Sequence, residues 1–240
     1  TEREALYRFS GGDARKLLNI LEIIVSSFSN NEKIIIDNNV VINRLQENIA
    51  LYDKNGEQHY DIISAFIKSI RGSDPDAALY WMARMLAGGE DPLFIARRMI
   101  ILSSEDIGLA NPNALLIAQA CFDALHKIGM PEGRIVLSHA VIYLATSPKS
   151  NSAYLAIEAA MEEVNRSGDL PVPLHLRNAP TKLMKELNYG KGYKYAHSYQ
   201  GNFAEQEFLP NELSNCKFYE PGSNSKEEEI KKRLQALWKK

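Results

Sequence analysis

Five proline-led segments in the middle of the chain constrain its fold more than any other feature. In each, apolar residues recur at helical spacing after the proline. Proline suits the first position of a helix, where its missing N–H would be unpaired anyway, and a preceding Asp, Asn or Ser can cap the free amides. The five pairs are Asp74-Pro75, Asp91-Pro92, Asn111-Pro112, Met130-Pro131 and Ser147-Pro148.

Glycines follow the same segments where helices should end. A glycine after the last periodic residue is typical of a helix C-terminus, because it adopts the left-handed backbone conformation without strain. The pattern predicts an all-α fold in which five consecutive helices with short connections form an antiparallel bundle or stacked hairpins. The glycines are Gly72, Gly88, Gly89, Gly108, Gly129 and Gly168.

The N-terminal region is expected to form a small helical module. Apolar residues along one side of residues 13–28 predict a helix, and three isoleucines before Asp37 predict an extended piece that leads into another helix. Residues 53–56 are rich in turn formers, which predicts a boundary there. We therefore assign residues 1–52 to this module and residues 53–168 to the helical oligomerisation bundle.

Residues 169–240 are expected to form an irregular extension, rich in Pro, Tyr and Lys, that completes the C-terminal domain. Three prolines near its start favour an extended path, and three later glycines oppose long helices. From Ser225 the pattern is helical again. Three pairs of opposite charge at i,i+4 spacing, the first of them Glu227 with Lys231, should stabilise this helix.

Composition excludes several classes of protein. A charged fraction of 24% and a net charge of −2 give no overall attraction to nucleic acid, so DNA binding would need a local cluster. The two cysteines and five histidines show no ligand spacing, which argues against a metal site. No apolar run reaches the roughly 20 residues of a membrane span, and no signal peptide is visible, so we expect a cytoplasmic location. Because the chain begins at Thr1, we interpret it as part of a longer polypeptide.

A basic and aromatic segment runs from Val172 to Tyr195, with Glu186 as its one acid. Its lysines could bind DNA phosphates while its tyrosines stack on unpaired bases. In the alternative, structural interpretation, the tyrosines pack across the bundle or a subunit contact and the lysines are solvated. The candidate contact residues are Arg177, Lys182, Lys185, Lys191, Tyr193, Lys194 and Tyr195.

The sequence contains no phosphate-binding loop. Gly190-Lys191 is similar to the end of one, but Lys185 stands where the first glycine belongs. Gly192 also replaces the Ser or Thr that binds magnesium. The isoleucines before Asp37 are similar to a Walker B strand, for which a buried strand end with a turn-forming Asp is the simpler account. We therefore expect no catalytic residue in this chain and no ATP hydrolysis by it alone.

A helix predicted from Pro92 to about Ile107 carries basic residues in its middle and acids at its end. Acids at a helix C-terminus oppose the macrodipole, so compensating partners are expected. Arg98 and Glu105 are seven residues apart, which places them on one face without direct contact. We favour a structural network of ion pairs between helices over a catalytic carboxylate pair.

Three stretches closely resemble the replication-associated recombination protein A family of AAA+ ATPases. They are SGGDARKLLN at residues 10–19, PVPLHLRNAPTK at 171–182 and GYKYAH at 192–197. The family is similar to clamp loaders and to the Werner-helicase-interacting protein of eukaryotes. On this resemblance, Arg15 is the sensor-2 arginine of the AAA+ lid, which points toward the terminal phosphates of a nucleotide.

The resemblance also implies a function for the longer protein. Family members are DNA-dependent ATPases that use ATP and Mg²⁺ and act at stalled forks, DNA ends or gaps. They form tetramers through the C-terminal helical domain, bind single-stranded-DNA-binding protein and associate with the nucleoid. This chain would then be the lid remnant and tetramerisation domain. The alternative is a stand-alone helical adaptor that binds protein or single-stranded DNA without ATPase activity.

Overall fold

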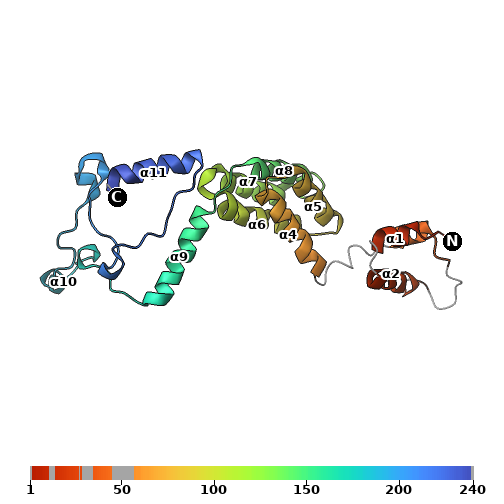
Figure 1. Cartoon of the computed structure of the whole chain (residues 1–240), viewed down its shortest axis with the longest axis horizontal. Coiled ribbons are helices and arrows are strands. Elements are labelled where there is room, and N and C mark those ends of the chain that lie inside the picture. The colour runs from red at the N-terminus through yellow and green to blue at the C-terminus, as the bar shows by residue number, and fades with distance from the viewer. Residues whose placement is uncertain (1, 11–13, 27, 29–34, 45–56, 239–240) are drawn as a thin grey trace. The chain divides into compact units, whose positions relative to one another are not determined.

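The computed structural model describes residues 2–10, 14–26, 28, 35–44 and 57–238, and these residues contain helices and no β-strand (Figure 1). The predicted all-α fold is therefore confirmed for this part of the chain. The side chains of residues 15, 16, 19, 23 and 57–59 lie outside the description as well. The chain divides into two compact units, Thr1–Ile95 and Ala96–Lys240, which we describe separately.

The start of the first unit is a small cluster of helices. Helices α1 (Glu4–Ser10) and α2 (Ala14–Ser26) pack together with helical residues 38–44. The Asp37 carboxylate accepts a hydrogen bond from the backbone N–H of Val40 at 2.8 Å, so Asp37 caps the last of these helices. The expected boundary between residues 52 and 53 falls outside the described residues and stays a prediction. The buried core of the cluster is Ala5, Ile20, Ile24 and Val41.

Helices α4 (Glu57–Arg71) and α5 (Pro75–Ala87) form a hairpin in the same unit. The predicted start of α5 is confirmed, because Pro75 is its first residue and the Asp74 carboxylate accepts a hydrogen bond from the Ala77 N–H at 2.9 Å. Apolar residues from both helices fill the hairpin. The buried ones are Ile62, Ile63, Phe66, Ile70, Ala78, Met82 and Met85.

Helix α6 (Pro92–Leu102) begins as predicted, with the Asp91 carboxylate accepting from the Leu93 N–H at 2.9 Å. The expectation that it runs as one helix to Ile107 is only partly met. After Leu102 the chain widens into a π-helix, η1 (Ser103–Ile107), and then tightens into a 3-10 turn, η2 (Gly108–Ala110). Arg98 and Glu105 were expected to share one face because they are seven residues apart in a regular α-helix. The wider π-helical turn between them changes that spacing.

The second unit continues with α7 (Asn113–Ile128) and α8 (Gly133–Thr146), which pack against each other. Asn111 joins the start of α7 to the end of α8. Its side-chain oxygen accepts from the Asn113 N–H at 3.3 Å, and its amide nitrogen donates to the hydroxyls of Tyr143 and Ser147, each at 3.0 Å. The core here includes Ala114, Ala118, Cys121, Leu125, Leu137, Ala140, Val141 and Leu144.

Helix α9 (Ser152–Ser167) starts later than the sequence predicted. Ser147 does not cap it, because the Ser147 hydroxyl donates to the Tyr143 carbonyl oxygen at 2.7 Å and accepts from Asn111. Ser147 and Pro148 therefore end the previous helix. The Ser150 hydroxyl accepts instead from the N–H of Ser152, the first residue of α9, at 3.3 Å.

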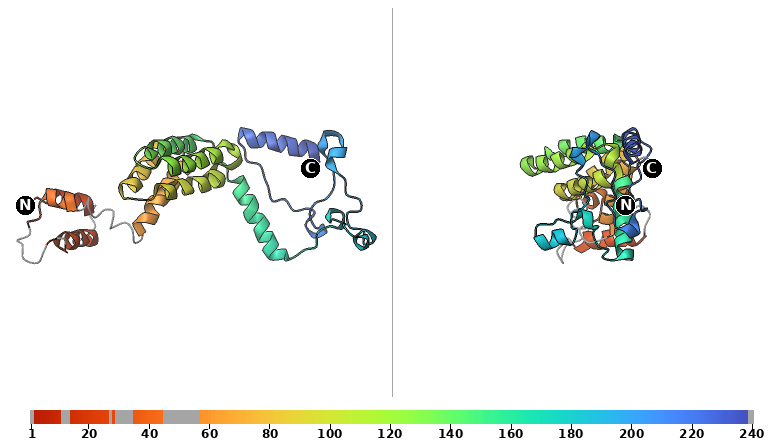
Figure 2. Two further views of the ribbon diagram at one scale, coloured as in Figure 1. Left: turned by 180° about the vertical axis from the view of Figure 1, so that it is seen from behind. Right: turned by 90° about the vertical axis from the view of Figure 1, so that its left-hand side faces the viewer.

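The remainder of the second unit is irregular, as predicted, with short turns followed by one long helix (Figure 2). Among the described residues, none of the helices has the length and apolar character needed to cross a membrane. The elements are η3 (Leu174–Leu176), α10 (Lys182–Glu186), η4 (Ala196–Ser198), η5 (Gln200–Asn202), η6 (Asn211–Leu213) and α11 (Ser225–Trp238).

Candidate functional site

The basic segment is held in place by Arg177, which is half-buried. Its Nε donates to the Val172 carbonyl oxygen at 2.6 Å and its Nη1 donates to the Tyr189 hydroxyl at 3.2 Å. The guanidinium also lies over the Tyr189 ring, 5.1 Å from the centroid. Arg177 therefore links Val172, before α10, to Tyr189, after it.

Lys194 is also engaged within the chain. Its backbone N–H donates to the Gln206 side-chain oxygen at 3.1 Å, and the Gln206 amide donates back to the Lys194 carbonyl oxygen at 2.9 Å. The Lys194 ammonium donates to the Glu205 carbonyl oxygen at 2.9 Å. These bonds fix the path of the chain on both sides of Tyr193 and Tyr195.

The other candidate residues present their functional groups to solvent. Lys182, Lys185 and Lys191 are exposed, and their side-chain ammonium groups make no hydrogen bond or ion pair with the part of the chain that the structure describes. Tyr193 and Tyr195 are 48% and 58% exposed. Exposed ammonium groups can bind an anion and exposed rings can stack on a base, so the structure leaves these five residues available for an external contact.

Glu227, which the sequence analysis paired with Lys231, has the most buried polar side chain in the described part of the chain, at 0% exposure. Its carboxylate accepts hydrogen bonds from the Ser152 hydroxyl, from the Tyr219 hydroxyl at 3.2 Å and from the Asn224 amide at 2.5 Å. Its backbone N–H donates to the Asn224 side-chain oxygen at 3.0 Å. Glu227 thus joins the first turn of α11 to the first residue of α9.

The pKa of Glu227 is lowered to about 2. Burial acts in the opposite direction and raises it, but hydrogen bonds from the hydroxyls of Ser150 and Ser152, the backbone of Gly222 and the amide of Asn224 favour the charged form and outweigh burial. A signal for this role was present in the sequence. Asn224 and Glu227 have the spacing of a capping box, in which each side chain accepts a hydrogen bond from the backbone N–H of the other residue at a helix start.

Lys149 completes this support at the end of α8. Its ammonium donates to the carbonyl oxygens of Leu144, Ala145 and Ser147, at 3.2, 2.9 and 2.6 Å. Burial lowers the pKa of Lys149, and the charge of Asp106 partly offsets that effect. The next residue, Ser150, donates its N–H to the Asp106 carbonyl oxygen at 2.8 Å, so the loop between α8 and α9 is fastened to η1.

Two further predictions concern a nucleotide-sensing residue and the presence of metal ligands. Arg15 lies in the first turn of α2, and its side chain is outside the described residues. Across the ranges that the structure describes, no group of three His, Cys, Asp or Glu side chains is arranged to hold a metal ion.

Residues 72–238 match the family described as MgsA AAA+ ATPase C terminal, and residues 1–71 match the family described as AAA C-terminal domain. The chain belongs to the MgsA AAA+ ATPase C-terminal family. This result confirms the resemblance to replication-associated recombination protein A that the three sequence stretches predicted. The two family regions meet at residues 71 and 72, at the end of α4.

Relatives of this MgsA family chain carry names that agree with the assignment. It is 45% identical over 97% of its length to the replication-associated recombination protein A of Coxiella burnetii, and 41% identical over 97% to that of Escherichia coli, covering 53% of each relative. It is also 37% identical over 90% of its length to the ATPase WRNIP1 of Dictyostelium discoideum, covering 27% of that protein. The chain thus spans about half the length of the first two relatives.

Proposed function

We propose that this chain holds together the subunits of a AAA+ ATPase that acts in DNA replication, recombination and repair, and that the assembly is a tetramer. The observation that carries the proposal is the match of nearly the whole chain to the C-terminal regions of such ATPases. The helical second unit supports it, because rigid helices with apolar faces can fix the geometry between neighbouring subunits.

ATP and Mg²⁺ would be bound mainly by parts of the longer protein that lie outside this chain. Within the chain, the proposed contribution is Arg15, whose guanidinium could form two hydrogen bonds to phosphate oxygens and stabilise charge as the phosphoryl group leaves. The position of Arg15 near the start of α2 is compatible with that role.

Sedimentation equilibrium of the 240-residue chain at micromolar concentration tests the assembly directly. We expect a mass of four chains that falls on dilution. A monomer at every concentration would contradict the proposed function.

The coding sequence upstream of Thr1 distinguishes this proposal from the rival hypothesis of a stand-alone adaptor. A P-loop followed by a Walker B strand would support the ATPase, and a start codon directly before Thr1 would support the adaptor.

A second proposed contribution is a DNA contact through Lys191, Tyr193 and Tyr195, which the structure presents to solvent. Lys191→Glu with Tyr193→Ala should weaken binding of fluorescently labelled single-stranded DNA, measured by anisotropy, and should reduce its salt dependence. Lys231→Glu on α11 is the matched control, because its side chain is 48% exposed and lies outside the segment. Equal affinity in all three chains would place DNA binding elsewhere. Association with single-stranded-DNA-binding protein can be measured with the same variants.

A further inference from the structure

Helix α9 carries an apolar face that the rest of its own unit leaves open. Its one buried residue is Ser152, at its first position. Four apolar side chains at a spacing of three and four residues lie between 43% and 56% exposed, which is the spacing of a helix that packs against a partner. They are Tyr154, Ile157, Met161 and Val164.

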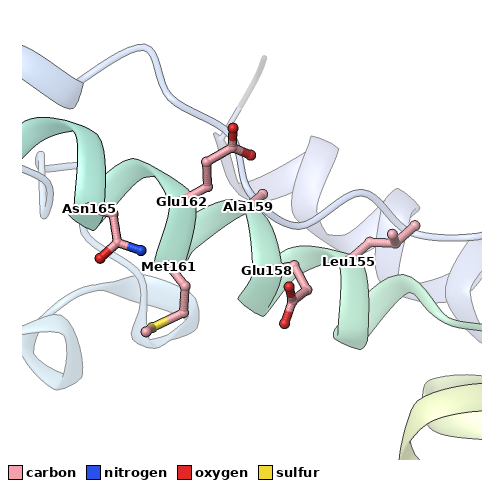
Figure 3. A pocket seen from close by; sticks show the side chains of 6 residues that line it. All are labelled: Leu155, Glu158, Ala159, Met161, Glu162 and Asn165. Carbon is pink, nitrogen blue, oxygen red and sulfur yellow. The ribbon is translucent and has the colours of Figure 1, made fainter.

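One edge of this face is acidic. Glu158 and Glu162 are exposed and one turn apart, whereas Glu163 is paired with Arg166 at 2.7 Å. Together with Leu155, Ala159, Met161 and Asn165, the two exposed glutamates line a shallow cavity of about 480 Å³, and Figure 3 shows Glu158, Met161 and Asn165 on the same side of α9. The cavity therefore combines apolar and negatively charged walls.

The chain contains a segment with the complementary chemistry. Leu183 on α10 and Leu187 directly after it are 64% and 52% exposed and four residues apart, and the exposed Lys182 and Lys185 lie beside them. Glu186 is the only acid in this turn. In its own chain α10 lies away from α9 (Figure 1), so the two surfaces do not satisfy each other within one molecule.

We propose that α10 of a second copy of this chain, together with Leu187 directly after it, docks on α9, with Leu183 and Leu187 against Leu155 and Met161 and with Lys182 and Lys185 against Glu158 and Glu162. The inference rests on the proposed function and identifies one of its subunit contacts. A two-fold arrangement makes the contact twice, α9 with α10 of the partner and α10 with α9 of the partner. Two such contacts approach the roughly 800 Å² per partner of a stable interface better than one helix face does.

Charge decides against the simplest alternative, in which two α9 helices pair face to face. That pairing would bring Glu158 and Glu162 of both copies into one interface, and like charges side by side are unfavourable. The same glutamates also make the face unsuited to a nucleic acid partner, because phosphates would be repelled.

Charge reversal tests the proposal. Glu158→Lys with Glu162→Lys, and separately Lys182→Glu with Lys185→Glu, should each raise the apparent dissociation constant at least tenfold in sedimentation velocity of the 240-residue chain. Mixing the two variants should restore wild-type assembly, because both contacts of a mixed pair then join opposite charges. The controls are Glu220→Lys with Glu229→Lys, whose side chains are 78% and 72% exposed and lie outside both surfaces.

The outcomes separate the two proposals. A wild-type chain that is monomeric throughout overturns the proposed function together with this contact. A wild-type chain that assembles, with variants that assemble equally well, overturns only the contact. Variants that dissociate but are not rescued by mixing overturn the α9–α10 pairing. Circular dichroism verifies that each variant retains its helices.

Discussion

At the scale of single residues, Gly108 combines a positive φ with a close approach to backbone, so the fold depends there on the absence of a side chain. Its φ of 48° and ψ of −128° suit glycine, and a Cβ there would lie 3.0 Å from the Ser150 carbonyl oxygen. Gly108→Ala should lower the free energy of unfolding by about 1–3 kcal/mol, because backbone strain and the close contact add. Urea denaturation followed by circular dichroism measures the change.

Gly168→Ala is the matched control for this prediction. Gly168 has a similar backbone conformation, with φ of 69° and ψ of −159°, but a Cβ there meets nothing within 4 Å. The difference between the two variants therefore reports the contact with Ser150. Equal losses of stability would show that the close approach to the Ser150 carbonyl oxygen adds no cost.

Glu227 should make stability depend on pH in the acid range. Because its folded pKa is lowered from 4.5 to about 2, the carboxylate contributes stability above pH 4.5 and loses it as the pH falls toward 2. Glu227→Gln, which cannot titrate, should be less stable by about 1–3 kcal/mol at neutral pH and should lose less stability on acidification. Thermal denaturation between pH 2 and pH 6 tests this, and parallel curves for the two proteins would refute it.

At the scale of elements, Lys149 shows how the end of α8 is satisfied by a side chain from outside the helix. Lys149→Met removes three hydrogen bonds to carbonyl oxygens and should lower the free energy of unfolding by about 1–2 kcal/mol. Lys149→Arg keeps the charge near the same carbonyls and should recover most of the loss. The melting temperatures of the three proteins provide the measurement, and a wild-type melting temperature in Lys149→Met would contradict the capping role.

The boundaries of these elements show what the sequence could and could not predict. The starts of α5 and α6 were predicted correctly, because Asp74 and Asp91 cap amides only two or three residues away. The start of α9 was predicted wrongly. The Ser147 hydroxyl is used by Asn111, 36 residues earlier, and such a distant partner leaves no trace in local spacing.

The same reason explains the error at α11. The i,i+4 spacing predicted that Glu227 pairs with Lys231, but the Glu227 carboxylate instead accepts a hydrogen bond from the hydroxyl of Ser152, 75 residues earlier. The ion pair that does form joins Lys231 to Glu228 at 3.8 Å and is exposed. In the basic segment, the sequence identified accessible lysines and tyrosines, but it could not reveal that Arg177 and Lys194 form bonds within the chain.

At the scale of the whole molecule, the proposed nucleotide sensing and the proposed assembly belong to different units, so they should be separable by mutation. In the full-length protein, Arg15→Ala should lower kcat for ATP hydrolysis by about 10- to 100-fold, which corresponds to the loss of a charge-assisted hydrogen bond worth about 1.5–3 kcal/mol. The mass of the assembly should not change. Arg8→Ala, an exposed arginine in α1, is the control, and equal turnover in both variants would argue against the sensor role.

The buried hydrogen bond between Ser152 and Glu227 has a consequence for a chain that a protease has cleaved. A protease that cleaves the exposed stretch around Gly192 would leave α9 and α11 on different fragments. The buried Glu227 carboxylate of one fragment would still accept a hydrogen bond from the Ser152 hydroxyl of the other. The two fragments should therefore travel as one species through a sizing column at neutral pH and come apart only in denaturant.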